Sequence, residues 1–238
     1  MLVPLPIYPV EPEALIVYTP PYFPDESQRE AYAQQRLQEL KAPLISRGIE
    51  VSSEVLQGPA GRTIVERVAH APTALLVLGT HGYRGLQRFL LGSTTVEVLR
   101  RAVCPTITVR TSGLEGPVRQ IGVGVDFSAA CEPAIEAAAQ MARAFGAQLH
   151  LIHVLTPVDF RGAAESSLPV FVAETNEATR HAAQEELQEI AGRLAGIDVI
   201  PVVLTNPSPY RELVRYTQEA SIDLLALGTH GRTGLRRL

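Results

Sequence analysis

Short apolar runs alternate with segments of helical periodicity through the second half of the chain. Runs typical of buried parallel strands cover residues 120–125, 148–155, 197–204 and 223–227. Between them, apolar residues recur at the spacing of one helix face. Strands and helices that alternate in this way predict a parallel sheet with right-handed crossovers and helices on both faces.

Three helices are predicted in this half. The first has Ser128 as a candidate cap, and its apolar face carries Ala134, Ile135, Ala138, Ala142 and Phe145. The second follows a loop that extends to about residue 172, and its apolar face carries Ala183, Leu187, Ile190, Ala191 and Leu194. The third covers about residues 210–220, after a turn that contains proline.

Two fifteen-residue segments of the chain repeat one another. Residues 75–89 read LLVLGTHGYRGLQRF and residues 224–238 read LLALGTHGRTGLRRL, with ten of fifteen positions identical and an offset of 149 residues. Carried backwards without gaps, the offset also aligns residues 49–55 with residues 198–204. The repeat is therefore a whole domain rather than a short motif.

The first half of the chain shows the later part of the same order of elements. A helix is predicted over about residues 25–47, a strand near 50–55, a helix near 62–70 and a strand over 74–78. This half then continues further than the second half, through a helix over 94–101 and a last strand over 106–110.

Residues 111–117 are rich in glycine and proline, which is typical of an interdomain linker. The predicted domains are therefore 1–111 and 118–238. Each is expected to be a copy of an open parallel five-stranded sheet with helices on both faces.

Both copies are predicted to be incomplete. By the offset, residues 1–5 align with 150–154, so the first copy lacks its first strand and helix; an alternative places its early strand at residues 14–18. The second copy lacks its last helix and strand, because it stops at Leu238 inside the glycine loop. The hypothesis that follows is that the chain is a fragment or an ordered subset of a longer tandem.

Composition and charge narrow the class of protein. The net charge of -4 is spread without a basic block, so neither nucleic acid nor a membrane surface is an expected partner. The apolar runs are far shorter than the ~20 residues that span a bilayer. No secretory signal follows Met1, and a cytoplasmic protein is the default expectation.

The sequence argues against several common sites. Cys104 and Cys131 lie outside any CxxC or Cys/His cluster, so we expect two small buried apolar residues rather than a disulfide framework or a zinc site. The only lysine, Lys41, lies in a helical pattern away from any glycine-rich loop. A Walker A phosphate loop is therefore excluded.

A glycine pattern follows the strand predicted over residues 74–78. Gly79 and Gly82 come directly after the strand, and Gly92, Ser93 and Thr94 open the next helix. Ligands of an open parallel sheet bind beyond the carboxyl ends of its strands, where glycines let backbone amides approach an anion. The free amides of a helix N-terminus favour phosphate, so the pattern predicts a cradle for a triphosphate.

The same helix start has a plainer explanation. Thr94 and Glu97 have the spacing of a capping box, in which the two side chains only satisfy the first amides of the helix.

At these glycines the chain resembles the universal stress protein family. It has the G-x2-G-x9-G-[ST] pattern of the ATP-binding members, from Gly79 through Gly82 and Gly92 to Ser93. The resemblance covers nearly the whole chain as two domains. It implies an adenine nucleotide alpha hydrolase-like fold, with ATP as ligand and Mg²⁺ as a possible accompanying ion.

The resemblance also implies an adenosine pocket in the second copy. In the family, an aspartate at the end of the first strand holds the adenosine end of the nucleotide, and Val125 and Asp126 match that position. A residue at the end of the second strand lines the base pocket, and Val154 falls there.

The two copies match different parts of the family's site. His81 belongs to the phosphate pattern of the first copy, and its start recurs in the second copy as Gly228, His230 and Gly231. The first copy thus has the full phosphate pattern without a visible aspartate. The second copy has Asp126 but ends before its Gly-Ser pair.

Structural explanations of these residues remain open. Asp126 could simply cap the helix that follows it. The turn residues His81 and His230 could bond to their own backbone as readily as to a ligand. His150 and His153 lie among apolar residues, and we predict strand-face residues rather than metal ligands.

The functional hypothesis from the sequence is nucleotide binding. No nucleophile with a nearby base and no DxD or HExxH arrangement can be identified, so no catalytic residue is predicted. We expect a regulatory or stress-response module in which bound ATP stabilises one arrangement of the domains. A slow ATPase or self-phosphorylating enzyme is one alternative. The other is an ATP-independent module that pairs through strand 106–109, within the chain or as a homodimer, as the family resemblance implies.

Overall fold

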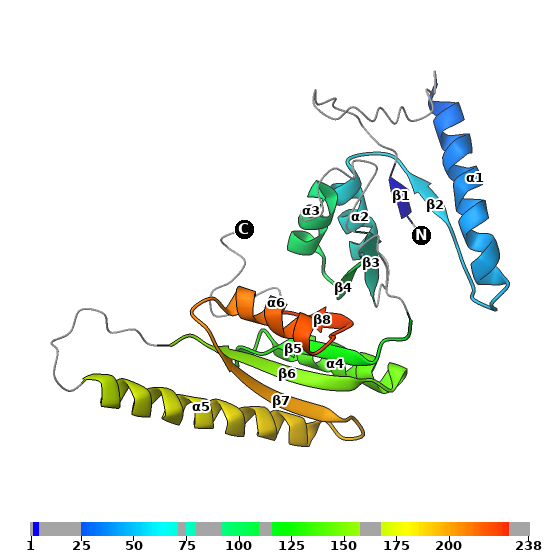
Figure 1. The fold of residues 1–238 in the computed structure, drawn as a ribbon. Coiled ribbons are helices and arrows are strands. Elements are labelled where there is room, and N and C mark those ends of the chain that lie inside the picture. Colours follow the sequence, from blue (N-terminus) through cyan, green and yellow to red (C-terminus); the bar gives the residue numbers. More distant parts are fainter. Residues whose placement is uncertain are drawn as a thin grey trace. The chain divides into compact units, whose positions relative to one another are not determined.

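The computed structural model describes residues 2–4, 25–70, 75–79, 92–109, 116–157 and 168–228. The chain divides into two compact units, Met1–Gly113 and Leu114–Leu238. Both units are α/β with parallel strands (Figure 1), as the sequence predicts. No helix within the described ranges is long and apolar enough to cross a membrane.

The second unit alternates strands and helices along its whole length. Its elements in chain order are β5 (Gln120–Gly124), α4 (Glu132–Phe145), β6 (Gln148–Leu155), α5 (Leu168–Arg193), β7 (Val199–Thr205), α6 (Pro209–Glu219) and β8 (Leu224–Ala226).

All four strands of the second unit form one parallel sheet in the order β7-β6-β5-β8. The chain runs outward from β5 through β6 to β7 and then returns to place β8 on the other side of β5. In open α/β sheets, ligands bind beyond the carboxyl ends of the strands at such a reversal of strand order. The expected ligand position is therefore beyond the carboxyl ends of β5 and β8.

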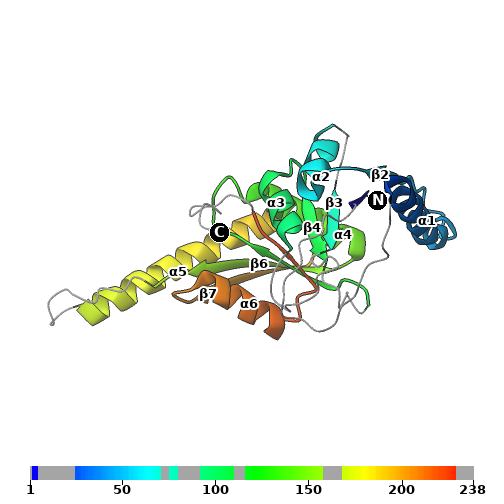
Figure 2. The same ribbon diagram turned by 90° about the horizontal axis from the view of Figure 1, so that it is seen from above.

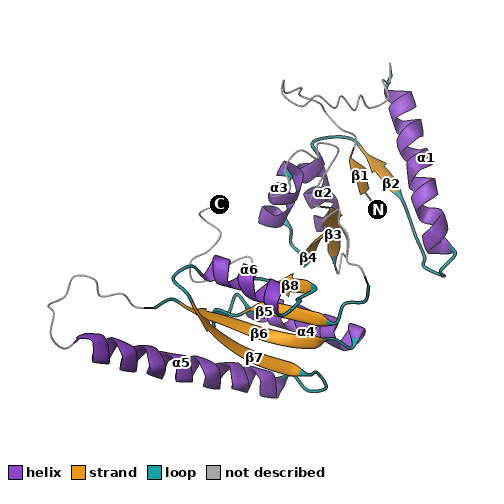
Figure 3. Ribbon diagram, viewed as in Figure 1, coloured by secondary structure: helices purple, strands orange, loops and turns teal. Residues whose placement is uncertain are grey.

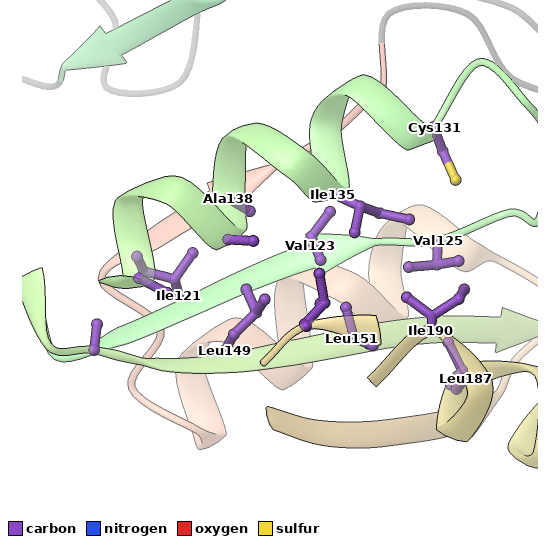
Figure 4. Packing of buried hydrophobic residues seen from close by; sticks show 14 of the residues in the cluster. Ile121, Val123, Val125, Cys131, Ile135, Ala138, Leu149, Leu151, Leu187 and Ile190 are labelled. Atoms are coloured by element: carbon purple, nitrogen blue, oxygen red, sulfur yellow. The ribbon is translucent and has the colours of Figure 1, made fainter. Parts of the chain in front are cut away.

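Alternate side chains of the central strands form the core of the second unit. Ile121 and Val123 of β5 and Leu149 and Leu151 of β6 are fully buried on one face of the sheet. Figure 4 shows them among residues of α4 and α5 such as Ile135 and Leu187, with which they form one cluster. Each large apolar side chain buried in this way contributes about 1.5–3 kcal/mol.

Helix α6 lies on the other face of the sheet (Figure 2), where β5 carries glycine instead of a side chain. A Cβ built on Gly122 would lie 3.0 Å from Ile152 Cδ1 and 3.3 Å from both Ile222 and Leu225. Glycine in a strand lets neighbouring groups approach the backbone closely. This approach allows β8 and its preceding loop to pack tightly beside β5.

The described part of the first unit also contains four strands and three helices. They are β1 (Leu2–Pro4), α1 (Glu26–Ile45), β2 (Glu54–Leu56), α2 (Ala60–Ala69), β3 (Leu76–Gly79), α3 (Ser93–Arg101) and β4 (Thr106–Val109). The strands form two separate parallel pairs, β1-β2 and β3-β4 (Figure 3).

The two separate pairs follow from the repeat. The offset of 149 residues makes β2 the equivalent of β7 and β3 the equivalent of β8. In the second unit, β5 joins the equivalents of these strands, since it lies between β6 and β8. The described part of the first unit has no strand in the place of β5, so its pairs remain unconnected.

The pairing of β1 with β2 shows that one alignment made from the sequence is wrong. Leu2 pairs with Glu54, whose equivalent Val203 pairs with His153. Leu2 therefore corresponds to His153, an offset of 151 (153 minus 2), so the alignment of residues 1–5 with 150–154 is wrong by two positions. The crossover from β1 to β2 is two residues longer than that from β6 to β7, which an alignment without gaps cannot detect. The alternative strand at residues 14–18 lies outside the described residues.

Some elements begin at other residues than the sequence predicts. The second strand of the first unit begins at Glu54 rather than near residue 50, and α5 begins at Leu168 rather than about residue 172. Phe145, predicted in the core, is 55% exposed because it is the last residue of α4. Gly146, in the left-handed conformation with φ 63°, ends the helix directly after it.

The two cysteines lie in different environments. Both are free thiols, and Cys131 is buried as predicted. Cys104 is only partly buried, so the prediction of a buried residue is wrong there.

Candidate functional site

In the first unit, a side-chain hydrogen bond holds the start of α3 against the end of β3. Thr95 is 4% exposed, and its Oγ1 donates to the carbonyl oxygen of Gly79 at 3.1 Å. Gly79 is the last residue of β3, and Ser93 is the first residue of α3. The bond therefore places a helix N-terminus at the carboxyl end of a parallel strand.

The start of α3 does not use the capping box that the sequence suggests. Gly92 is the N-cap, no side chain caps the helix, and Thr94 is already the second helical residue. The interpretation of Thr94 and Glu97 as a capping box is therefore wrong. Glu97 instead forms an exposed ion pair with Arg101, one turn further along the helix.

The first amides of α3 carry the partial positive charge of the helix. The first hydrogen bond of this helix runs from the Val96 amide to the Gly92 carbonyl oxygen at 3.0 Å. The amides of Ser93, Thr94 and Thr95 precede this bond and have no acceptor inside the helix. Such amides, together with the helix dipole, favour an anion.

Four of the predicted phosphate residues are brought together by β3 and α3. They are Gly79, Gly92, Ser93 and Thr94. Four others, His81, Gly82, His230 and Gly231, lie outside the described residues. Gly228 follows β8 at the end of the described chain. The sequence did not single out Thr95, although its place in a run of hydroxyl residues at the helix start is a signal that could have done so.

In the second unit, Asp126 closes a tight turn directly after β5. Its Oδ1 accepts hydrogen bonds from the Ser128 amide at 3.0 Å and from the Ser128 Oγ at 2.6 Å. An aspartate that accepts from the backbone two residues ahead forms an Asx-turn. Asp126 and Ser128 therefore do not cap α4, whose N-cap position is Cys131.

Val125 and Val154 lie beside this turn. The Val125 amide donates to the carbonyl oxygen of Ile152 at 2.8 Å, which extends the pairing of β5 and β6 by one residue. Val154 is half-buried near the carboxyl end of β6, where it pairs with Leu204 of β7. The structure thus brings Val125, Asp126 and Val154 to the same edge of the sheet.

The structure adds His153 and Phe127 to this edge. Nδ1 of His153 lies 2.7 Å from the Val125 carbonyl oxygen, and its ring lies 4.4 Å from the ring of Phe127 between centroids. Phe127 has a φ of 58°, in the left-handed region that bulky residues rarely adopt. Neither contact is visible in the sequence, because His153 and Val125 are 28 residues apart.

Cys131 lies near Asp126 but is not a reactive thiol. Burial raises the pKa of the Cys131 thiol, and the negative charge of Asp126 raises it further, although a backbone hydrogen bond works in the opposite direction. A thiol needs a lowered pKa to become a nucleophile at neutral pH. Cys131 is therefore a packing residue beneath the turn.

His150 forms a buried polar group with two partners from neighbouring elements. It is 5% exposed, with Nδ1 2.8 Å from the Tyr216 hydroxyl and Nε2 2.8 Å from Gln120 Oε1. Both ring nitrogens thus have protein partners. Over the described ranges, no three His, Cys, Asp or Glu side chains cluster in a way that could hold a metal ion.

The order of elements and the glycine pattern can now be compared with known proteins. The sequence model of the Universal stress protein family matches residues 2–110 and again residues 117–238. The chain belongs to the universal stress protein family. The two matches make it a tandem member with two copies of the family's domain.

Relatives of known sequence support this membership. The universal stress protein Rv2005c of Mycobacterium tuberculosis is 32% identical over 199 residues, which are 79% of this chain and 62% of that protein. The universal stress protein Rv2623 of the same organism is 31% identical over 193 residues, which are 77% of this chain and 60% of that protein. The chain thus spans less than two thirds of the length of these relatives.

Solved structures of universal stress proteins share the fold. One from Archaeoglobus fulgidus superposes with a TM-score of 0.60 at 19% identity and covers 84% of this chain and 67% of its own. Another, from Pseudomonas aeruginosa, has a TM-score of 0.59 at 21% identity and covers 85% of this chain and 69% of its own. At these identities the likeness shows the tandem α/β fold alone.

Proposed function

We propose that this universal stress protein binds ATP and acts as a nucleotide-dependent regulatory module of the stress response. The hydrogen bond from Thr95 to Gly79 carries the proposal, because it holds the first amides of α3 beyond the end of β3. That position combines two features that favour phosphate, a helix N-terminus and the carboxyl end of a parallel strand. A triphosphate tail fits this chemistry.

Each unit carries part of a nucleotide site of its own. In the first unit, Gly92, Ser93 and Thr94 offer amides and hydroxyls to phosphate oxygens. In the second unit, the Asp126 carboxylate accepts hydrogen bonds, as recognition of ribose hydroxyls requires. Val154 offers an apolar contact for the base. We propose that the second unit binds the adenosine end of its own nucleotide through these residues.

Mg²⁺ would enter this site with the nucleotide. Magnesium is commonly held by substrate phosphates, one or two protein oxygens and several waters, rather than by a cage of protein side chains. The hydroxyls of Ser93 and Thr94 are of a suitable type at the start of α3. The ion would neutralise part of the charge of the triphosphate.

The expected role of the nucleotide is to stabilise the folded protein rather than to undergo reaction. A ligand that binds only the folded state adds about 2.7 kcal/mol of stability at a concentration of 100 times its Kd. Among the described residues, Cys131 is buried with a raised thiol pKa, and His150 is engaged by Tyr216 and Gln120. Neither group is suited to activate a nucleophile.

The test is ATP binding to the whole purified chain. We expect ATP with Mg²⁺ to raise the melting temperature and to give a measurable Kd by titration calorimetry. Ser93→Ala should weaken ATP binding at the first unit, whereas Asp126→Asn should weaken the binding of both ATP and adenosine at the second unit. Thr63→Ala is the matched control, because Thr63 is a hydroxyl residue in the first turn of α2 whose Oγ1 donates to the Pro59 carbonyl oxygen.

Two outcomes would contradict the proposal. Absence of ATP binding to the unchanged protein would exclude it altogether. Phosphate release from ATP above the buffer rate would favour the slow ATPase instead of a pure binding module.

A further inference from the structure

His153 contacts both neighbours of Asp126. Its Nδ1 lies 2.7 Å from the carbonyl oxygen of Val125, the residue before Asp126. Its ring lies against the ring of Phe127, the residue after Asp126, with an interplanar angle of 36°. One side chain from β6 therefore contacts the backbone before the candidate ligand group and the side chain after it.

The turn needs such support because its backbone is strained. Phe127 has a φ of 58°, in the left-handed region that is unfavourable for a bulky residue. A strained residue persists only where its surroundings determine its conformation. The Phe127 ring packs against the core cluster and against His153, which together oppose relaxation of the turn.

The hydrogen bond also identifies Nδ1 of His153 as a donor. A carbonyl oxygen only accepts, so Nδ1 must carry the proton that is donated to Val125. The Val125 amide is bonded to the carbonyl oxygen of Ile152 at the same time. The amide and the carbonyl oxygen of Val125 are thus both hydrogen-bonded to residues of β6. These bonds fix the direction in which the chain leaves the sheet.

We propose that His153 is a positioning residue that holds the Asp126 turn in the conformation that takes the adenosine end of the nucleotide. This inference rests on the proposed function, and it gives His153 a role through the turn rather than through contact with the ligand. Displacement of a binding group by about 1 Å is enough to lose much of its contribution. Loss of the His153 contacts should therefore weaken binding through Asp126.

The experiment compares three changes of one side chain, with adenosine and ATP as probes. His153→Ala removes both contacts, His153→Phe keeps a ring without a donor, and His153→Asn keeps a donor close to the position of Nδ1. We expect His153→Ala to raise the Kd of both probes about tenfold and His153→Asn to raise it less than about threefold. His181→Ala is the matched control, since His181 is exposed on α5, where it lies beside Glu185.

A double-mutant cycle separates positioning from general stability. In an Asp126→Ala background, His153→Ala should change the Kd of adenosine by less than about twofold, because the group that it positions is gone. If the double variant raised the Kd of adenosine by the product of the two single factors, the proposal would be overturned. A wild-type Kd in His153→Ala, in protein that melts as a folded chain, would overturn it too.

A second measurement needs no ligand and distinguishes failure of this inference from failure of the proposed function. The Ser128 amide donates to Asp126 within the turn, so its hydrogen exchange reports the conformation of the turn. We expect faster exchange in His153→Ala and exchange near wild type in His153→Asn. Unchanged exchange in His153→Ala would refute the positioning role, whereas absent ATP binding with the expected exchange would refute only the nucleotide function.

Discussion

The two units use the same repeat but organise their strands differently. In the second unit, β5 joins β6 to β8 and the four strands form one sheet. In the first unit, the equivalents of β6 and β8 are β1 and β3, and they belong to separate pairs. The central strand, rather than the number of repeated elements, therefore determines whether the flanking strands share a sheet.

The cores of the two units differ accordingly. Among the described residues, the main cluster of the second unit contains sixteen buried residues, whereas that of the first contains three: Ile64, Val68 and Val98. Val77 of β3 is 57% exposed, whereas its equivalent in β8, Ala226, is half-buried beside Val123 of β5. Because β5 pairs with a strand on each side, its neighbours share one core with it. In the described part of the first unit, β1-β2 and β3-β4 have no such strand between them.

The largest expected effect tests this difference in core size. Leu151→Ala should destabilise the second unit by about 2–5 kcal/mol, because Leu151 is fully buried in the central cluster. Val77→Ala is the control in the first unit and should change stability by no more than about 0.5 kcal/mol. Urea unfolding followed by circular dichroism measures both. Equal effects would mean that the cores do not differ as described.

The next effect concerns the tight approach of β8 and its preceding loop to β5. Gly122→Ala should cost about 1–3 kcal/mol, because the new methyl group would meet Ile152, Ile222 and Leu225 at 3.0–3.3 Å. Gly192→Ala in α5 is the control, since nothing lies within 4 Å of its Cβ position, and it should stabilise the helix. Thermal unfolding of both variants checks the prediction. A stabilised Gly122→Ala would show that the three side chains can move aside.

A smaller effect is expected where the first unit joins β3 to α3. Thr95→Val removes the hydrogen bond to Gly79 while it keeps the shape of the buried side chain, and should cost about 0.5–1.5 kcal/mol. It should also weaken ATP binding if α3 holds phosphate. Thr63→Val, at the exposed start of α2, should leave both quantities unchanged. Calorimetric titration and urea unfolding on the same samples would show whether stability and binding change together.

The smallest expected effect is a dependence of stability on pH that is specific to the second unit. Burial lowers the pKa of His150, and the charge of Asp198 opposes this shift only in part. The unfolded chain therefore binds a proton more readily, so stability is full above the ordinary pKa of about 6.5 and decreases as the pH falls below it. His150→Gln should reduce this slope in urea unfolding between pH 8 and pH 5, whereas the exposed His181→Gln should not.

Much of the fold could be predicted from periodicity alone. Residues 148–155 were predicted as a strand and form β6 with the same bounds. The repeat also predicted the equivalence of α2 with α6, since their first residues, Ala60 and Pro209, differ by the offset of 149. The offset failed only at β1, because an insertion inside a long crossover leaves no trace in an alignment without gaps.

The candidate site could be predicted less completely, for physical reasons. Glycines after a strand and a helix start are local patterns, so Gly79 and Gly92 could be found from spacing. The bond from Thr95 to Gly79 and the contacts of His153 depend on tertiary packing between separate elements. The left-handed conformation of Phe127 has no local signal either, because the sequence would favour glycine there.

The strand pair β3-β4 has a further consequence for handling the protein. Each strand has a single hydrogen-bonded neighbour among the described strands, and Val77 and Val109 are exposed on them. Apolar side chains exposed on a strand favour association between molecules. We expect concentrated solutions to become turbid through the N-terminal half first, while the helical signal of the C-terminal half persists.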